Sequence, residues 1–176
     1  MSCGARPAPL FGLYLFLAGL WTGALAFFAA GAGIVLRSAP TRADGGVVNR
    51  ALLDALDVGS LALAALLLAG AAVLNRRRPW SATSRALSLR LLAVAAVAAF
   101  VSLYLITPEL VALRAKAGPL FDTLPAADPL RRAWTRLHAL SLLTLLVRLG
   151  SAVAVFTLGY RQLGPAPPVT TAEGTS

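Results

Sequence analysis

The chain has 176 residues, of which 58% are hydrophobic and only 13% are charged, and its mean hydropathy is +0.76. Soluble domains are about 45–50% apolar and about 25% charged, so this composition excludes a soluble globular fold. The net charge of +9 does not indicate a nucleic-acid-binding protein, because most of the basic residues lie at the ends of the apolar segments or between them.

Four apolar stretches are long enough to cross a bilayer, which takes about 20 residues: 9–36, 55–74, 89–106 and 137–160. In hydrocarbon each stretch must satisfy its own backbone polar groups, so we expect helices. The predicted fold class is all-α, a polytopic membrane protein with a bundle of four transmembrane helices over residues 9–162. An N-terminal tail over 1–8 and a disordered C-terminal tail over 163–176 flank this domain.

The first apolar segment carries no charge between residues 10 and 36. A signal peptide has an apolar core of only about 7–15 residues, so we expect a retained membrane helix rather than a cleaved signal. Gly19 and Gly23 form a GxxxG motif, which lets a second helix approach closely. The motif predicts either packing inside the bundle or a homo-oligomer.

The second segment contains Asp57 inside its apolar run, and residues 47–59 can extend this helix beyond the membrane. The basic run Arg76, Arg77 and Arg78 follows it. Basic residues at a helix end mark topology and can bind anionic lipid head groups. We therefore expect the lipid bilayer as a partner, with anionic head groups at these three arginines.

Thr107 and Pro108 follow the third segment. Because the residue before a proline is pushed out of helical geometry, we expect the third helix to end there. Glu109 comes directly after this break, and residues 109–117 can form a short surface helix. The residues from 118 to 129 are rich in turn-forming types.

A polar stripe marks the fourth segment, where His138, Ser141 and Arg148 fall on one helical face. An arginine in a membrane helix stays protonated, so it must find an anion, a carbonyl or water. Asp57 is the acid inside an apolar run, so we predict an Arg148–Asp57 contact with the second and fourth helices adjacent. The alternative is a solvated Arg148 that lines a cavity with Ser141 and Thr144.

The chain contains one His, one Cys and one Met. Haem in a membrane protein usually takes two axial ligands and a metal site takes three or four, so the sequence predicts no metal and no cofactor. Ser141 lies three residues from His138 on the same helix. A protease would need its nucleophile and its base on neighbouring helices, so this spacing does not predict such a site. We predict no catalytic residue and no enzyme. We expect His138 at the membrane boundary beside Glu109.

Four crossings place both termini on one side of the membrane, together with the arginine-rich connection between the second and third helices. We expect this side to be the cytoplasm, because the opposite connections hold most of the acids. Fifteen of the sixteen basic residues are Arg, and Ala and Leu are abundant, which suggests a GC-rich bacterial genome. The predicted location is the inner (cytoplasmic) membrane.

Four runs follow one another along the chain: GLWTG, LRSAPTRADGGVVNRALLDALDVG, YLITPELVALR and DPLRRAWTRLHALS. In this order they resemble the domain-of-unknown-function 4149 membrane family, which is related to the transmembrane-protein-205-like proteins, over residues 10 to about 156. The most specific parts are two groups: Thr107, Pro108, Glu109 and Arg114, and Trp134, Leu137, His138 and Ser141. The resemblance implies a four-helix integral membrane protein without an established reaction, and it adds Arg114 to the candidate polar site.

Two functions remain open. In the first, the protein binds or passes a small solute or ion along the polar seam on the fourth helix. In the second, it is a non-catalytic accessory or structural subunit of a membrane complex, and the seam fixes only the fold or a partner. Water that reaches Arg148 favours the first function, whereas a dry, paired Arg148 favours the second.

Overall fold

The computed structural model describes residues 9–77 and 81–162, and every regular element in these ranges is helical. The elements are α1 (Pro9–Ser38), α2 (Arg42–Arg77), α3 (Ala82–Val101), the π-helical turn η1 (Ser102–Ile106), α4 (Thr107–Ala117), the 3₁₀ helix η2 (Gly118–Thr123) and α5 (Pro129–Arg161). Four helices are long and apolar enough to cross a membrane. The predicted all-α membrane protein with four spanning helices is confirmed. The predicted tails, 1–8 and 163–176, and Arg78 lie outside the described residues.

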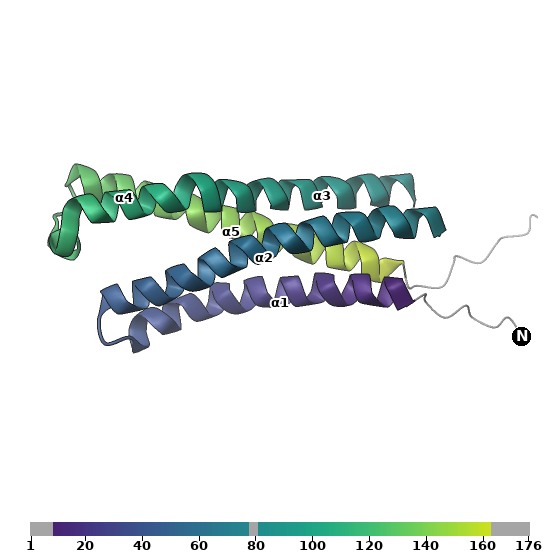
Figure 1. Ribbon diagram of the computed structural model, residues 1–176, viewed down its shortest axis with the longest axis horizontal. Helices are drawn as coiled ribbons and strands as arrows, with labels where there is room; N and C mark the ends of the chain where they lie inside the picture. Colours follow the sequence, from purple (N-terminus) through teal and green to yellow (C-terminus); the bar gives the residue numbers. More distant parts are fainter. Residues whose placement is uncertain (1–8, 78–80, 163–176) are drawn as a thin grey trace, which may run out of the picture.

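The four long helices run side by side as an elongated bundle (Figure 1). The start of α1, the end of α2, the start of α3 and the end of α5 lie at one end, and α4, η2 and the α1–α2 connection lie at the other. With 30 to 36 residues each, α1, α2 and α5 are about 45–54 Å long, whereas the hydrocarbon core is about 30 Å thick. The helices are therefore longer than the predicted spans.

Side-chain caps fix where the helices begin. The Thr41 hydroxyl accepts a hydrogen bond from the Asp44 N–H at 3.1 Å and donates to its carboxylate at 2.7 Å, which starts α2. Asp128 accepts from the Leu130 N–H at 2.8 Å, and Pro129 occupies the first turn of α5. Gly118 ends α4 with a φ of 61°, a conformation that glycine adopts without a steric penalty.

The prediction that the third helix ends at Thr107 is wrong, because the helix continues through Pro108 into α4. The wide turn η1 ends two residues before the proline, and the Thr107 N–H donates to the Ser102 carbonyl five residues earlier. A proline ring clashes with the carbonyl of the preceding turn in a regular α-helix. The extra residue of a π turn changes this spacing, so the helix remains continuous in spite of the proline.

The bundle has the cyclic order α1, α2, α3, α5, since these neighbours make the closest backbone approaches. The expectation that the second and fourth membrane helices, α2 and α5, are adjacent is therefore wrong, because they face each other diagonally. Packing rather than the hydrophobic effect drives association in a membrane, and small residues permit it. The buried small residues at the helix contacts are Ala18, Ala64, Ala95, Ala99 and Ala152, each at most 1% exposed.

Candidate functional site

Arg148 lies in the middle of the bundle interior, and its side chain is fully buried. Its Nη1 contacts the Asp57 carboxylate as a hydrogen-bonded ion pair, and its Nε donates to the Thr144 carbonyl on the same helix at 3.3 Å. The predicted Arg148–Asp57 contact is present. The long guanidinium side chain crosses the bundle between the diagonal helices α2 and α5, so the contact forms although the helices are not neighbours.

Asp57 is also fully buried, and it has polar neighbours on two elements. The Ser102 hydroxyl, carried by η1, lies beside the carboxylate without satisfying hydrogen-bond geometry. Asp54 lies one helical turn away on α2. The Oδ2 atom of Asp57, the Nη2 atom of Arg148 and the hydroxyl of Ser102 lack hydrogen-bond partners among the described residues. This centre therefore retains one donor, the Arg148 Nη2, one acceptor, the Asp57 Oδ2, and one hydroxyl, that of Ser102, which can both donate and accept.

A neutral hydrogen bond lies deeper on the same face of α2. The Trp21 indole N–H of α1 donates to the Ser60 hydroxyl at 3.1 Å, and both side chains are at most 1% exposed. Ser60 follows Asp57 by three residues, so the two lie on one helical face. We name Trp21, Asp57, Ser60, Ser102 and Arg148 the central cluster. Every membrane helix contributes to it, with Ser102 in the π turn of the third.

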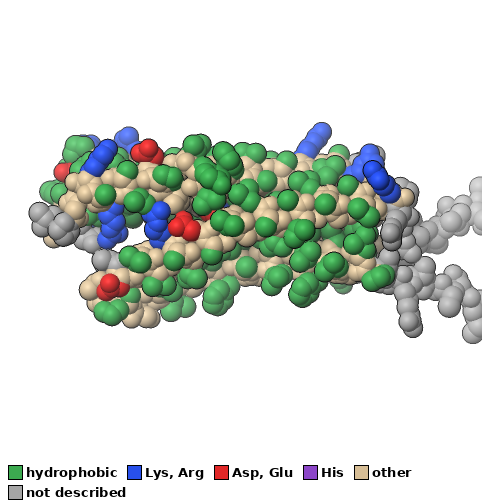
Figure 2. All heavy atoms as spheres, in the orientation of Figure 1, with side chains coloured by type: hydrophobic (Ala, Val, Ile, Leu, Met, Phe, Trp, Pro, Cys, Tyr) green, Lys and Arg blue, Asp and Glu red, His purple; other side chains and the backbone are tan. Residues whose placement is uncertain are grey.

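A row of charges on α2 connects the central cluster with the end of the bundle that carries α4. Arg50 and Asp54 form an ion pair at 3.6 Å, and their side chains are 42% and 38% exposed. Asp57, one turn further in, is 0% exposed. The charged side chains of α2 therefore change from solvent-exposed to fully buried over two helical turns. On the visible face, acidic side chains lie toward the α4 end and the opposite end shows only basic ones (Figure 2).

The structure divides the predicted site residues into two groups. Ser141 is buried on α5 seven residues before Arg148, and its carbonyl accepts from the Thr144 hydroxyl at 2.8 Å. Glu109 and Arg114 lie instead on α4, beyond Ser102 along the chain, and His138 lies on α5 ten residues before Arg148, outside the central cluster. The predicted site residues therefore form two separate groups in the structure and not a single site.

Aromatic rings organise the outer group. The Arg114 guanidinium lies 5.4 Å from the centre of the Phe121 ring, and Phe121 meets Trp134 edge-on at 5.4 Å. The exposed His138 ring stacks on Trp134 at 4.8 Å with an angle of 9° between the planes. Glu109 forms neither a hydrogen bond nor an ion pair with His138, both of which are described. The expected pairing fails because His138 lies flat against Trp134.

Sequence reasoning missed Trp21 and Ser102. Each is a polar or amphipathic residue well inside an apolar segment, where it must find a partner in the protein, and that property is the signal that could have identified both. Within residues 9–77 and 81–162, no three His, Cys, Asp or Glu side chains gather so that they could hold a metal ion.

The two glycines of the GxxxG motif on α1 have different surroundings. A Cβ atom on Gly19 would lie 3.4 Å from the Phe156 ring of α5, so this glycine packs inside the chain. A Cβ atom on Gly23 would meet nothing within 4 Å, and Gly23 is exposed. The two glycines of the GxxxG motif therefore do not act as one contact in the monomer.

A family model described as "Domain of unknown function (DUF4149)" matches residues 16–119. The matched range contains Trp21, Asp57 and Ser102 but ends before α5, so it excludes Arg148 and His138. No curated protein matches the chain. No solved structure matches it either.

Proposed function

This chain belongs to the DUF4149 family, whose description gives no function, and we propose that it acts as a non-catalytic accessory or structural subunit of a membrane complex. One observation carries the proposal: Arg148 and Asp57 contact each other and are both fully buried. A group that binds or passes a solute needs access from water, whereas a pair that fixes helix positions works best when it is dry. The central cluster therefore serves the fold.

The composition of the central cluster supports this role. It takes one or two side chains from each membrane helix, and the pair and the Trp21–Ser60 hydrogen bond can form only when α1, α2 and α5 are in register. An unpaired charge in the interior is strongly unfavourable, so misaligned bundles are disfavoured. The outer surface is apolar, with Phe16, Phe27 and Val97 more than 60% exposed. A rigid interior and an apolar outside suit a protein that packs against lipid or partner helices.

The partners and the location form part of the same proposal. We place the protein in the inner membrane of a bacterium with both termini cytoplasmic, and with anionic head groups at Arg76, Arg77 and Arg78. The exposed Gly23 face of α1 remains the surface for a homo-oligomer, with Gly19 committed to the contact with Phe156.

Cysteine labelling in intact cells tests the topology in a Cys3→Ser background. Ser81→Cys and Gln162→Cys, which lie at one end of the bundle, should be labelled from the cytoplasm, and Ala126→Cys from the outside. Labelling of Ser81→Cys and Gln162→Cys from outside the cell would reverse the orientation. Labelling of these two positions from different sides would remove the four-span topology itself.

Purification of the native protein in mild detergent, followed by mass spectrometry of everything that stays bound, tests the accessory role. We expect a second membrane protein in fixed stoichiometry, whose retention survives a change of detergent. As a control, a tagged unrelated four-helix protein should not retain it. A preparation that holds only this chain, with a small molecule or ion bound, would contradict the proposal.

A second function, the binding or passage of an ion, is favoured by the row Arg50, Asp54 and Asp57. This row leads from the wet end to a carboxylate whose second oxygen has no partner among the described residues. Proton flux into liposomes that contain the purified protein and a trapped pH dye tests it. Flux that exceeds that of empty liposomes and disappears in Asp57→Asn would support the second function. Equal flux for wild type and empty liposomes would support the accessory role.

A further inference from the structure

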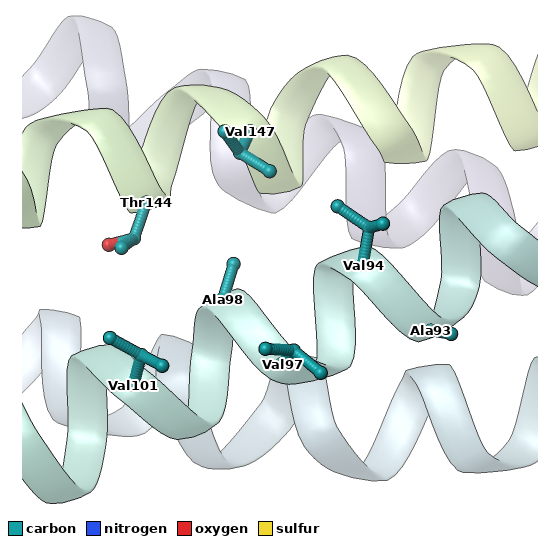
Figure 3. Close-up of a pocket in the computed structure, with 7 residues that line it drawn as sticks. All are labelled: Ala93, Val94, Val97, Ala98, Val101, Thr144 and Val147. Atoms are coloured by element: carbon teal, nitrogen blue, oxygen red, sulfur yellow. The ribbon is translucent and has the colours of Figure 1, made fainter.

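An apolar groove runs along the outside of the bundle between α3 and α5 (Figure 3). It has a volume of about 410 Å³ and is lined mainly by Val94, Val97, Ala98 and Val101 of α3 and by Thr144 and Val147 of α5. Val94 is 49% exposed and Val97 is 62% exposed. The groove therefore opens toward the bilayer and not toward the central cluster.

Arg90 lies in line with this groove on α3. Steps of four, three and four residues lead from Arg90 to Val94, Val97 and Val101, which is the spacing of one helical face. Arg90 is exposed. Side chains on a helix lean toward its N-terminus, and a long arginine can extend its charged group in that direction. The guanidinium therefore reaches toward the membrane surface at the α2–α3 end, and the groove continues below it.

No protein group neutralises Arg90 within the part of the chain that the structure describes. The acids nearest to it in sequence are Asp57 and Glu109, and α3 and the adjacent α5 contain none. Arg90 makes no hydrogen bond or ion pair with any residue in 9–77 or 81–162. The neighbouring Arg85, in contrast, donates to the Asn75 side chain at 3.2 Å. An exposed arginine without a protein partner on a membrane face is available to an anion at the membrane surface, such as a lipid phosphate.

We propose that Arg90 and the α3–α5 groove together bind an anionic phospholipid. The phosphate group pairs with the Arg90 guanidinium, and one acyl chain lies in the groove along Val94, Val97 and Val101. Eleven residues separate Arg90 from Val101, a rise of about 16 Å, which matches about half of the 30 Å hydrocarbon core. The site thus spans a single leaflet, the one on the side of the α2–α3 connection. It does not depend on the accessory role proposed above.

Native mass spectrometry of the delipidated full chain tests the proposal, with titration of phosphatidylglycerol and of phosphatidylcholine that carry the same acyl chains. Wild type should bind the first phosphatidylglycerol about fivefold more tightly than phosphatidylcholine, as expected for one basic residue near the surface. Arg90→Gln should lose this preference. Ala98→Phe, which fills the groove, should weaken the first binding event for both lipids, whereas Ala62→Phe on the exposed side of α2 should not.

Arg161→Gln is the matched control, because Arg161 is an exposed arginine at the same end of the bundle but outside the groove. Wild-type preference in Arg161→Gln and none in Arg90→Gln supports the site. Equal loss in both variants would overturn the site in favour of diffuse surface attraction. Displacement of the lipid by millimolar inorganic phosphate would also overturn it, because the acyl chain would then contribute nothing.

Discussion

The interior of the bundle around Arg148 and its outer surface around Arg90 contain the same side chain in different surroundings. Both arginines belong to apolar helices. Arg148 is fully buried against Asp57, whereas Arg90 is exposed and pairs with no residue in the described ranges. A buried charge must be paired within the protein, whereas a charge at the surface can use water or lipid phosphate. Their contributions to stability should therefore differ widely.

The interior pair should give the largest effect. We expect Asp57→Ala or Arg148→Met alone to lower the free energy of unfolding by about 3–5 kcal/mol. The first variant leaves the buried Arg148 guanidinium without its anion, and the second leaves the buried Asp57 carboxylate without its cation. The double variant should lose less than either single variant. Thermal unfolding in detergent measures the cycle. Removal of the exposed Arg50–Asp54 pair by Arg50→Ala is the control, with an expected loss below about 1 kcal/mol. Additive losses would refute the pairing.

Loss of the neutral hydrogen bond in the interior should cost less. Trp21→Phe removes the indole N–H from the buried Ser60 hydroxyl and reduces the packed volume, so we expect a loss of about 1–3 kcal/mol. Trp134→Phe makes the same chemical change on a half-buried ring at the end of the bundle, and its loss should be smaller. Equal losses of stability for Trp21→Phe and Trp134→Phe, in urea or thermal unfolding, would show that the buried hydrogen bond of Trp21 adds no stability.

Two glycines extend the comparison to packing. A Cβ atom on Gly159 would lie 2.8 Å from Leu15 Cδ2, so Gly159→Ala should cost about 1 kcal/mol by overpacking the α1–α5 contact. Gly23→Ala meets open space and should leave the melting temperature unchanged or slightly higher. Size-exclusion chromatography of Gly23→Ala shows in addition whether this face mediates self-association. A large destabilisation by Gly23→Ala would place it in a contact within the chain.

The outer arginine should give the smallest effect on stability. Arg90→Gln removes a charge without a partner in the described structure, so the melting temperature in neutral detergent should change by less than the equivalent of about 0.5 kcal/mol. In the presence of phosphatidylglycerol, the wild type should gain a higher melting temperature that Arg90→Gln lacks. A loss near that of Arg148→Met in lipid-free detergent would mean that Arg90 is part of the fold.

Part of this architecture follows directly from the order of residues. Four apolar runs of bilayer length specify four helices, because no other backbone conformation in those runs satisfies its polar groups in hydrocarbon. A buried arginine cannot lose its proton and therefore needs a partner. Because few acids lie within the apolar runs, the sequence predicted Asp57 as the partner of Arg148, and the two side chains are in contact. Physical necessity and a small number of candidates made these features predictable.

Other features depended on the packing of the helices. Nothing in the local sequence of Ser102–Ile106 specifies a π turn rather than a break at Pro108, because the choice rests on whether the continuing helix packs against α5. The cyclic order of the helices, and with it the diagonal placement of α2 and α5, is likewise a global property of side-chain fit. Helical periodicity gives the face of each residue, but only the packed bundle decides which faces meet.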